Sequence, residues 1–389
     1  MTPSLRHLRV FLAVLDCGTV TGAARACNIS QPAASQAIAR LEREAGVALI
    51  HHARDASGPT DAGQSFGRRV RRALARLDAS LSAVAPRLVL TATRAQLNAL
   101  ISVRDVENFT FAAQRLGLSQ PSVHRAVTQL EAEAGRPLFQ RTGKRMQPTR
   151  AAQALADAAR LCFSELEQAA AELAELAGRE AGQIVIGALP LSRSIVLPRA
   201  IAEFRRLRPT MRLRILDGPY TDMLAGLWRG EVDMIVGALR DPLPVPEVAQ
   251  TPLFTDDLVL VVRPGHPLLA AGTPGLDDLA RYPWIVPRPG TPSRASFGRF
   301  LDTFGPRKLA MIECSSLVLT RELLILSDHI GCISRLQAGA EIALGALSVL
   351  NVTLPESARP IGLTTREDWL PTAAQAQLVE ILRRVGESL

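Results

Sequence analysis

Two stretches near the start of the chain share one pattern of apolar and polar positions. In each, apolar residues at helical spacing predict a first helix, over residues 8–15 and 97–103. A second helix is expected to begin near Thr19 or Asn108 and carries an Ala-Ala pair, which lets another helix approach closely. The third predicted helix has apolar residues at i, i+4, i+7 and i+11, namely Ala34, Ile38, Leu41 and Ala45 in one stretch and Val123, Val127, Leu130 and Ala134 in the other.

The shared pattern is an internal repeat. Residues 8–64 (copy 1) align with residues 97–153 (copy 2) at a constant offset of 89 without a gap, and 20 of the 57 positions are identical. The densest part is Ser30–Gly46 against Ser119–Gly135, where nine of 17 positions agree. Two copies are too few for a solenoid, so the front of the chain is predicted to hold tandem small domains.

The third helix of each copy has a capped start and a polar outer face. Ser30 and Ser119 stand where an N-cap belongs, and a proline follows in the first turn, where its missing N–H costs nothing. A helix, a tight turn and a capped polar helix are typical of a helix-turn-helix, in which Gln and Arg bind base edges. The alternative is an ordinary solvated helix face. The expected DNA contacts are Gln31, Pro32, Ser35 and Gln36 in copy 1 and Gln120, Pro121, Ser122, His124 and Arg125 in copy 2.

A segment that resembles a wing follows each third helix. In copy 2 it contains Gly143 among the basic residues Arg141, Lys144 and Arg145, which suits a turn lying against phosphates. The copy 1 segment, from Leu49 to Arg54, is less charged. Long helices are then predicted over residues 60–84 and 149–177. The second has an apolar stripe that predicts a dimer or inter-domain seam, formed by Leu155, Ala159, Phe163, Leu166, Leu173 and Leu176.

The charge of the chain is unevenly distributed. Residues 1–150 hold 21 Lys+Arg and 10 Asp+Glu (net +11), residues 151–178 hold one and five (net −4), and residues 179–389 hold 23 and 22 (net +1). The basic front favours nucleic acid over membrane as a partner. No apolar run reaches a membrane span of roughly 18–20 residues, the start is not typical of a signal peptide, and the five cysteines form no CxxC pair. We therefore expect a cytoplasmic protein with reduced thiols and no membrane partner.

From Gln183 the pattern changes to alternating strands and helices. Short apolar strands are predicted at 184–189, 212–217, 233–238 and 257–262, which indicates an α/β domain with a largely parallel sheet. The fold class is thus multidomain, with two winged helix-turn-helix units before a two-lobed α/β domain. The expected domains are residues 1–84, 90–178 and 179–389, with the second lobe at about 270–350.

A small ligand is expected between the two lobes of the α/β domain. Open α/β sheets bind ligands at the carboxyl ends of strands, against helix N-termini. Hydroxyl and N–H groups there suit an anionic or hydroxylated molecule, although Ser192 and Thr291 have the alternative role of capping helices. Cys314 and Cys332 are either a redox pair or, as packing favours, buried small residues. The candidate ligand residues are Ser192, Ser194, Gly218, Pro219, Ala238, Arg240 and Thr291.

The motifs of copy 2 closely resemble those of LysR-type transcriptional regulators. The matching pieces are Ala112-Ala113, the run LSQPSV from Leu118, Leu130-Glu131, Gly135, the run LFQR from Leu138, and Pro148-Thr149. The resemblance implies a winged helix-turn-helix before a periplasmic-binding-protein-like effector domain, which Gly230-Glu231-Val232-Asp233 also fits. The family usually has one winged unit, whereas this chain has two. Copy 2 has Arg141 in the wing where copy 1 has His52, so copy 2 is expected to be the main DNA reader, and copy 1 either extends the site or serves packing.

These observations predict a sequence-specific regulator controlled by a small-molecule effector. The chain has no HExxH, GxSxG, P-loop or GxGxxG motif, so we expect neither an enzyme nor a cofactor. The alternative is a non-catalytic cytoplasmic solute-binding protein whose basic repeat serves structural or protein contacts. The resemblance implies dimers or tetramers on double-stranded DNA, and the expected partners are DNA, an unidentified small molecule, further copies of the chain and RNA polymerase.

Overall fold

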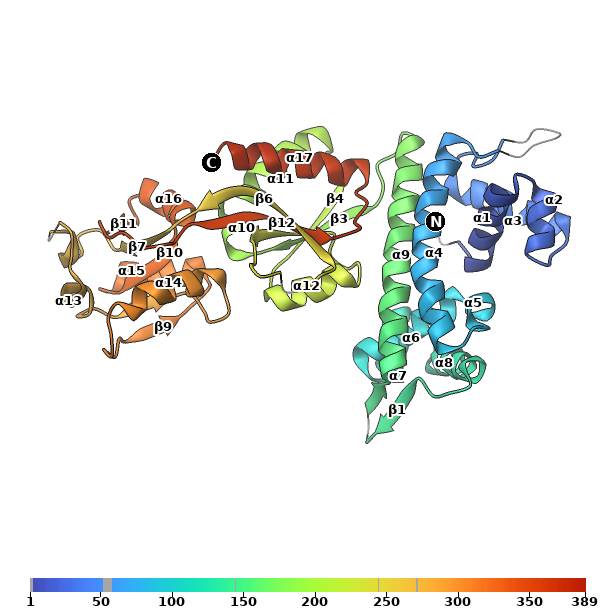
Figure 1. Cartoon of the computed structure of the whole chain (residues 1–389), viewed down its shortest axis with the longest axis horizontal. Helices are drawn as coiled ribbons and strands as arrows, with labels where there is room; N and C mark the ends of the chain where they lie inside the picture. The colour runs from blue at the N-terminus through green and yellow to red at the C-terminus, as the bar shows by residue number, and fades with distance from the viewer. Residues whose placement is uncertain (1–2, 52–57, 144, 244, 271) are drawn as a thin grey trace. The chain divides into compact units, whose positions relative to one another are not determined.

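The computed structural model describes residues 3–51, 58–143, 145–243, 245–270 and 272–389 (Figure 1). The chain divides into two compact units. The first contains the residues up to Gln183 together with Trp228–Glu231, and the second contains the rest. Within the described ranges, none of the helices combines the length and the apolar character needed to cross a membrane.

Copy 1 forms the first helices of the first unit. The Ala-Ala pair of the second helix is buried, as the pattern predicts. Thr19 and Ser30 are the N-caps, and their side chains accept hydrogen bonds from the N–H groups of Gly22 and Ala33. The helices are α1 (Leu5–Cys17), α2 (Val20–Ala26), α3 (Gln31–Ala45) and the long α4 (Asp61–Val84).

Copy 2 repeats this arrangement after the short helix α5 (Leu88–Thr91). Asn108 and Ser119 cap its second and third helices, and the predicted apolar positions of the third helix are buried. Its elements are α6 (Arg94–Val106), α7 (Phe109–Leu116), α8 (Gln120–Ala134), the hairpin strands β1 (Phe139–Thr142) and β2 (Arg145–Pro148), and α9 (Arg150–Leu176). The hairpin is antiparallel, with Phe139 opposite Pro148.

The two copies share one hydrophobic core. Helices α4 and α9 pack side by side, and a single cluster of buried side chains includes the apolar residues of both copies (Figure 1). The apolar stripe predicted on α9 is buried from Leu155 to Leu173. Leu176, the last residue of the helix, is 62% exposed and lies outside this core.

The first sheet of the second unit has the strand order β4-β3-β5-β12-β6. Its strands are β3 (Gln183–Ala188), β4 (Arg212–Leu216), β5 (Met234–Ala238), β6 (Val248–Asp256) and β12 (Arg359–Arg366). Strand β3 runs parallel to β5, but β12 is antiparallel to both β5 and β6. Strands β3, β5 and β6 therefore run in one direction, as a largely parallel sheet predicts, and β12 opposes them because it returns from the second lobe.

Helices flank the first sheet, and the last of them completes its hydrophobic core. The C-terminal helix packs against α11, and both contribute buried residues to the core that covers β3, β5 and β12. These helices are α10 (Pro190–Ser194), α11 (Val196–Leu207), α12 (Tyr220–Trp228) and α17 (Ala373–Glu387).

The second sheet has the strand order β11-β7-β10-β8-β9. Strand β8 is parallel to β9 and β10, whereas β7 is antiparallel to β10 and β11. The segment predicted at 257–262 belongs to this sheet as β7, so the second lobe starts earlier than residue 270. Its elements are β7 (Leu258–Val262), α13 (Leu276–Leu279), β8 (Trp284–Val286), α14 (Pro292–Asp302), β9 (Met311–Glu313), α15 (Leu317–Leu326), β10 (Ile330–Ser334), α16 (Arg335–Ala343) and β11 (Ser348–Val349).

A buried ion pair lies where the chain crosses between the two sheets. Asp256 ends β6, directly before β7, and Arg359 begins the returning strand β12. Nη2 of Arg359 lies 2.6 Å from Oδ2 of Asp256, and the hydroxyl of Ser334 donates to Oδ1 at 2.9 Å. A further hydrogen bond runs from Arg359 to Ser293 at the start of α14. These contacts join the ends of both crossing strands to the second sheet.

Candidate functional site

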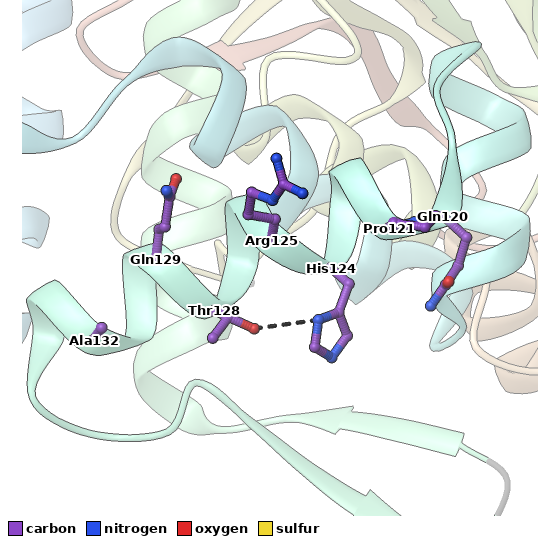
Figure 2. Close-up of a pocket in the computed structure, with 7 residues that line it drawn as sticks. All are labelled: Gln120, Pro121, His124, Arg125, Thr128, Gln129 and Ala132. Atoms are coloured by element: carbon purple, nitrogen blue, oxygen red, sulfur yellow. Dashed lines mark hydrogen bonds between the residues drawn. The ribbon is translucent and has the colours of Figure 1, made fainter.

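The outer face of α8 forms a shallow pocket of polar side chains. Its lining consists of Gln120, Pro121, His124, Arg125, Thr128, Gln129 and Ala132 (Figure 2). Figure 2 shows two rows: Arg125 and Gln129 project to one side of the helix, and Gln120, His124 and Thr128 to the other. Such i, i+4 rows are what an α-helix places on one surface. The sequence prediction named the first four of these residues and Ser122, which is also exposed.

Several side chains on this face form no hydrogen bond or ion pair within the part of the chain that the structure describes. Arg125, Gln120 and Gln129 are exposed and make no hydrogen bond or ion pair with another residue of the described chain. His124 differs, because its ring packs 5.0 Å from the Phe109 ring and its Nδ1 lies 3.4 Å from the Thr128 hydroxyl. The face therefore offers free amide and guanidinium donors beside one positioned imidazole.

The equivalent face of α3 has a different set of groups. Subtracting the offset of 89 places Gln36 at the position of Arg125 and Ser35 at that of His124. Gln31 and Pro32 are exposed, and Nε2 of Gln31 donates to the Ser35 hydroxyl at 3.2 Å. Gln36 is also exposed. Both copies thus present polar side chains at the start of the third helix, but with unlike chemistry.

A half-buried carboxylate connects the third helix to the segment that follows it in both copies. Oε1 of Glu131 accepts hydrogen bonds from the N–H groups of Leu138 and Phe139, at 2.8 and 3.1 Å. In copy 1, Glu42 binds the equivalent N–H groups of residues 49 and 50 at the same two distances. Leu41-Glu42 and Leu130-Glu131 stand at equivalent positions, but neither glutamate was predicted from the sequence to have a role. The presence of a glutamate at this position in both copies was the signal in the sequence that could have identified it.

The basic side chains of the copy 2 wing are exposed. Arg141 lies on β1 and Arg145 on β2, and both are open to solvent. Nε of Arg141 donates to the Gly143 carbonyl at 3.4 Å, and Arg145 approaches Glu107 at 3.8 Å. Lys144 lies outside the described residues, as do His52 and Arg54 of copy 1. The hairpin therefore holds two exposed guanidinium groups.

The structure separates the candidate ligand residues of the second unit into two groups. The Ser192 side chain is buried and its hydroxyl donates to the Leu189 carbonyl at 2.8 Å. The Thr291 hydroxyl caps α14 by accepting from Arg294 N at 3.2 Å, as the capping alternative proposed. Their hydroxyls are therefore already used within the protein. The remaining candidates, which are partly or fully exposed, are Ser194, Gly218, Pro219, Ala238 and Arg240.

Arg240 joins the two lobes of the second unit. Its Nη1 donates to the Gly290 carbonyl at 2.8 Å, and its guanidinium carbon lies 4.4 Å from the centre of the Tyr220 ring. Its Nε is buried without a hydrogen-bond partner among the described residues. Burial raises the pKa of Tyr220, so its hydroxyl stays protonated at neutral pH. Sequence reasoning missed Tyr220, although it directly follows the candidates Gly218 and Pro219.

No metal centre is formed by the residues that the structure describes. They contain no group of three or more His, Cys, Asp or Glu side chains arranged to hold a metal ion.

Two family models match this chain. The model for the LysR substrate binding domain matches residues 177–387. The model for the bacterial regulatory helix-turn-helix protein of the LysR family matches twice, at residues 5–64 and 95–153. The two matches cover the helices and the following segment of copy 1 and copy 2.

Similar proteins include curated regulators and solved structures. The transcriptional regulator GalR of Pseudomonas putida is 32% identical, with 98% of this chain and 97% of GalR covered. PcaQ of Agrobacterium fabrum is 29% identical over 75% of this chain and 94% of its own length. A full-length OxyR variant of Pseudomonas aeruginosa shares the fold, with a TM-score of 0.56, 21% identity, and coverage of 76% of this chain and 94% of that chain. CbnR complexed with its target DNA also shares the fold, with a TM-score of 0.52, 21% identity, and coverage of 75% of this chain and 98% of that chain. The chain belongs to the LysR family of DNA-binding transcriptional regulators with an effector-binding domain.

Proposed function

We propose that this regulator uses a duplicated winged helix-turn-helix, in which α8 of copy 2 reads base edges. The observation that carries the proposal is the exposed face of α8, where Arg125, Gln120 and Gln129 have no partner in the described chain. Free guanidinium and amide groups at the start of a recognition helix suit guanine and adenine edges in the major groove. In this division, residues 1–84 and 90–178 are the two winged units and residues 179–389 the effector domain.

The wing of copy 2 supports this role by binding the DNA backbone. Arg141 and Arg145 are exposed on the hairpin, and Glu131 fixes the start of that hairpin to the reading helix. Phosphate contacts position a protein on the duplex but carry no sequence information. Arg141 and Arg145 are therefore assigned to affinity, and the face of α8 to specificity.

Selection from a random library of double-stranded DNA tests the proposal directly. The full chain is expected to enrich a defined sequence motif, and the affinity for that motif should fall as salt rises, because phosphate contacts release counterions. Failure to enrich any motif would contradict sequence-specific reading by this chain. Enrichment of the unchanged motif after Gln120, Arg125 and Gln129 are all replaced by alanine would contradict the role of α8.

We also propose that the effector is a small anion bound beside Arg240. This guanidinium group contacts both lobes and has a buried Nε without a partner among the described residues, and an unsatisfied buried donor favours a bound acceptor. The neighbouring Tyr220 hydroxyl is a protonated donor at neutral pH. Arg240 takes the place of Ser192 as the proposed ligand-binding residue, because the Ser192 hydroxyl already donates to the Leu189 carbonyl.

A thermal-shift screen with small carboxylates and phosphates tests the effector site. At least one such anion is expected to raise the melting temperature of the full chain, and Arg240→Ala should remove that shift. Arg383→Ala is the matched control, since Arg383 forms an exposed ion pair with Glu380 at 2.6 Å on the C-terminal helix. An equal shift in the Arg240→Ala and control variants would rule out the assigned site.

The regulator is proposed to act in the cytoplasm, where its DNA is, without catalysing a reaction. Further copies of the chain and RNA polymerase are the proposed protein partners, and dimers or tetramers are the proposed assemblies. Mass measurement by light scattering tests the assembly, because a strictly monomeric full chain on and off DNA would exclude it.

A further inference from the structure

The long helices of the two copies form an antiparallel pair within one chain. Arg69 of α4 binds Glu172 of α9, with Nε 2.7 Å from Oε2, whereas Arg72 lies 3.5 Å from Glu165. Residue numbers therefore rise along α4 as they fall along α9. Because α4 and α9 are equivalent elements of the repeat, starting at positions 61 and 150, this pairing relates copy 1 to copy 2 by an approximate two-fold axis.

Contacts at both ends of the helix pair agree with this two-fold relation. Arg87, just after α4, donates hydrogen bonds to the carbonyls of Ala132 and Glu133 near the end of α8. Arg179, just after α9, lies beside the end of α3, since a Cβ placed on Gly46 would be 3.3 Å from its Nη2. The third helix of each copy thus ends beside the segment that follows the long helix of the other copy.

The charges between the two helices specify an unlike pair. Arg69 is only 1% exposed and binds Glu172, Gln168 and Glu165, all from α9. In a pair of two α4 helices with the same register, subtracting the offset of 89 would replace these three acceptors by Ala83, Ala79 and Arg76. A buried guanidinium group without acceptors is strongly unfavourable. The α4–α4 pair is therefore disfavoured.

A pair of two α9 helices is disfavoured for the same reason. In such a pair with the same register, adding the offset of 89 puts Ala158 at the position of Arg69, opposite Glu172. It likewise puts Leu161 at the position of Arg72, opposite Glu165. Neither carboxylate would find a cation there. The buried network consequently favours copy 1 packed on copy 2 over either copy packed on its own kind.

We propose that a single chain carries both halves of a DNA-reading pair and recognises an inverted repeat whose two half-sites differ in sequence. The inference rests on the proposed DNA binding and extends it from copy 2 to both copies. The approximate two-fold axis presents α3 and α8 in inverted orientations. At equivalent positions these helices carry Gln36 and Arg125, which favour adenine and guanine respectively. The DNA site that fits these two helices is therefore an inverted repeat whose half-sites differ in sequence.

Selection from random double-stranded DNA, repeated with two variants of the full chain, tests the unlike half-sites. The unmodified chain should enrich a two-part inverted motif. Gln36→Ala should relax one half only and Arg125→Ala the other half only, so each variant is the control for the other. Two identical halves, a single half, or both variants acting on the same half would overturn the inference while leaving DNA binding intact. No enrichment at all would instead contradict the proposed function.

Titration of a duplex that holds one selected two-part motif tests whether both halves bind the same chain. Saturation is expected at one duplex per chain, whatever the size of the assembly. Two chains per duplex would overturn the inference. Inserting five base pairs between the halves turns them to opposite faces of the DNA and should weaken binding by about 10²-fold, the loss expected when two linked contacts become one.

The buried network provides a test of the linkage itself. Arg69→Glu places a third carboxylate beside Glu165 and Glu172, and should weaken binding to the two-part duplex by about 10²-fold without changing affinity for an isolated half-site. Adding Glu172→Arg should restore much of the loss. Equal losses on the two-part and single-half duplexes would show that the helix pair does not link the readers. If Arg69→Glu does not fold, the titration of the unmodified chain still decides.

Discussion

Gln36 and Arg125 occupy equivalent positions in the two copies but offer DNA different chemistry. Both are exposed in the second turn of the third helix. A carboxamide pairs best with adenine, and a guanidinium group with guanine. The wing arginines of copy 2 carry the same charge as Arg125 but lie on the hairpin, and their proposed contacts are with the phosphate backbone instead of the bases. Position within the copy therefore decides what an arginine contributes.

Arg125→Ala and Arg141→Ala should weaken DNA binding in distinguishable ways. Loss of Arg125 is expected to cost about 1–3 kcal/mol on the preferred sequence and to relax the choice of base at one position. Loss of Arg141 should weaken binding to all sequences alike and reduce the salt slope by about one. Binding isotherms on the selected motif and on unrelated DNA, at several salt concentrations, measure both effects. Uniform losses from Arg125→Ala would refute its role in base reading.

The cysteines should differ sharply in reactivity. Burial raises the pKa of Cys162 to about 12 and also raises that of Cys332, whereas Cys17 is exposed. Because the thiolate is the reactive form, Cys162 and Cys332 should resist alkylation by iodoacetamide at pH 8 until the chain is unfolded, while Cys17 reacts in the native protein. Mass spectrometry of labelled peptides measures this. Rapid labelling of native Cys332 would favour the redox role considered for Cys314 and Cys332.

At the scale of elements, one glutamate in each copy connects a helix to the segment that follows it. Glu131 and Glu42 each accept two backbone hydrogen bonds through a single oxygen. The acceptor lies seven and eight residues before its donors, so the contact fixes the direction in which the chain leaves the third helix. In copy 2 this contact fixes the start of the basic hairpin relative to α8.

Glu131→Ala should destabilise the chain by about 1–3 kcal/mol, because it leaves the N–H groups of Leu138 and Phe139 without their acceptor. Urea unfolding of the full chain measures the change. The control is Arg40→Ala, which breaks the helical pair with Glu44 at 3.1 Å and should cost at most about 0.5 kcal/mol, since Arg40 is 64% exposed. Similar losses in the two variants would argue against the anchoring role of Glu131.

The elements that follow from local rules were predicted well from sequence. Ser30 and Ser119 cap their helices as expected, because capping depends on neighbouring residues only. Features that depend on distant segments were not predictable. The direction of β12 is set by the return from the second lobe, and the partner of α9 is not specified by an apolar stripe. At the candidate effector site, the sequence likewise did not show that the Ser192 hydroxyl is bonded to the Leu189 carbonyl. Nor did it show that Arg240 stacks on Tyr220, because that contact joins distant segments.

At the scale of the whole molecule, copy 1 is part of the structure that supports copy 2. The buried residues of both copies form one cluster, and Arg69 contributes the central charge between α4 and α9. Two independent small domains on a linker would each have a closed core. Here α9 instead completes its burial against α4, so the two copies form one folding unit.

Deletion of residues 1–90 should therefore damage the remaining chain rather than merely remove one DNA contact. The truncation uncovers the apolar stripe of α9 and leaves Glu165 and Glu172 without their arginines. Exposed apolar area of this kind promotes association. We expect the truncated chain to aggregate or to bind the dye ANS, and to melt less cooperatively than the full chain, as measured by light scattering, dye fluorescence and circular dichroism. The variant Gln36→Ala is the control, because it changes only an exposed side chain of copy 1 and should melt like the unmodified protein. A well-behaved truncated chain with an unchanged melting transition would mean that copy 1 is dispensable for the core, and the pairing of α4 with α9 would then lose its structural role.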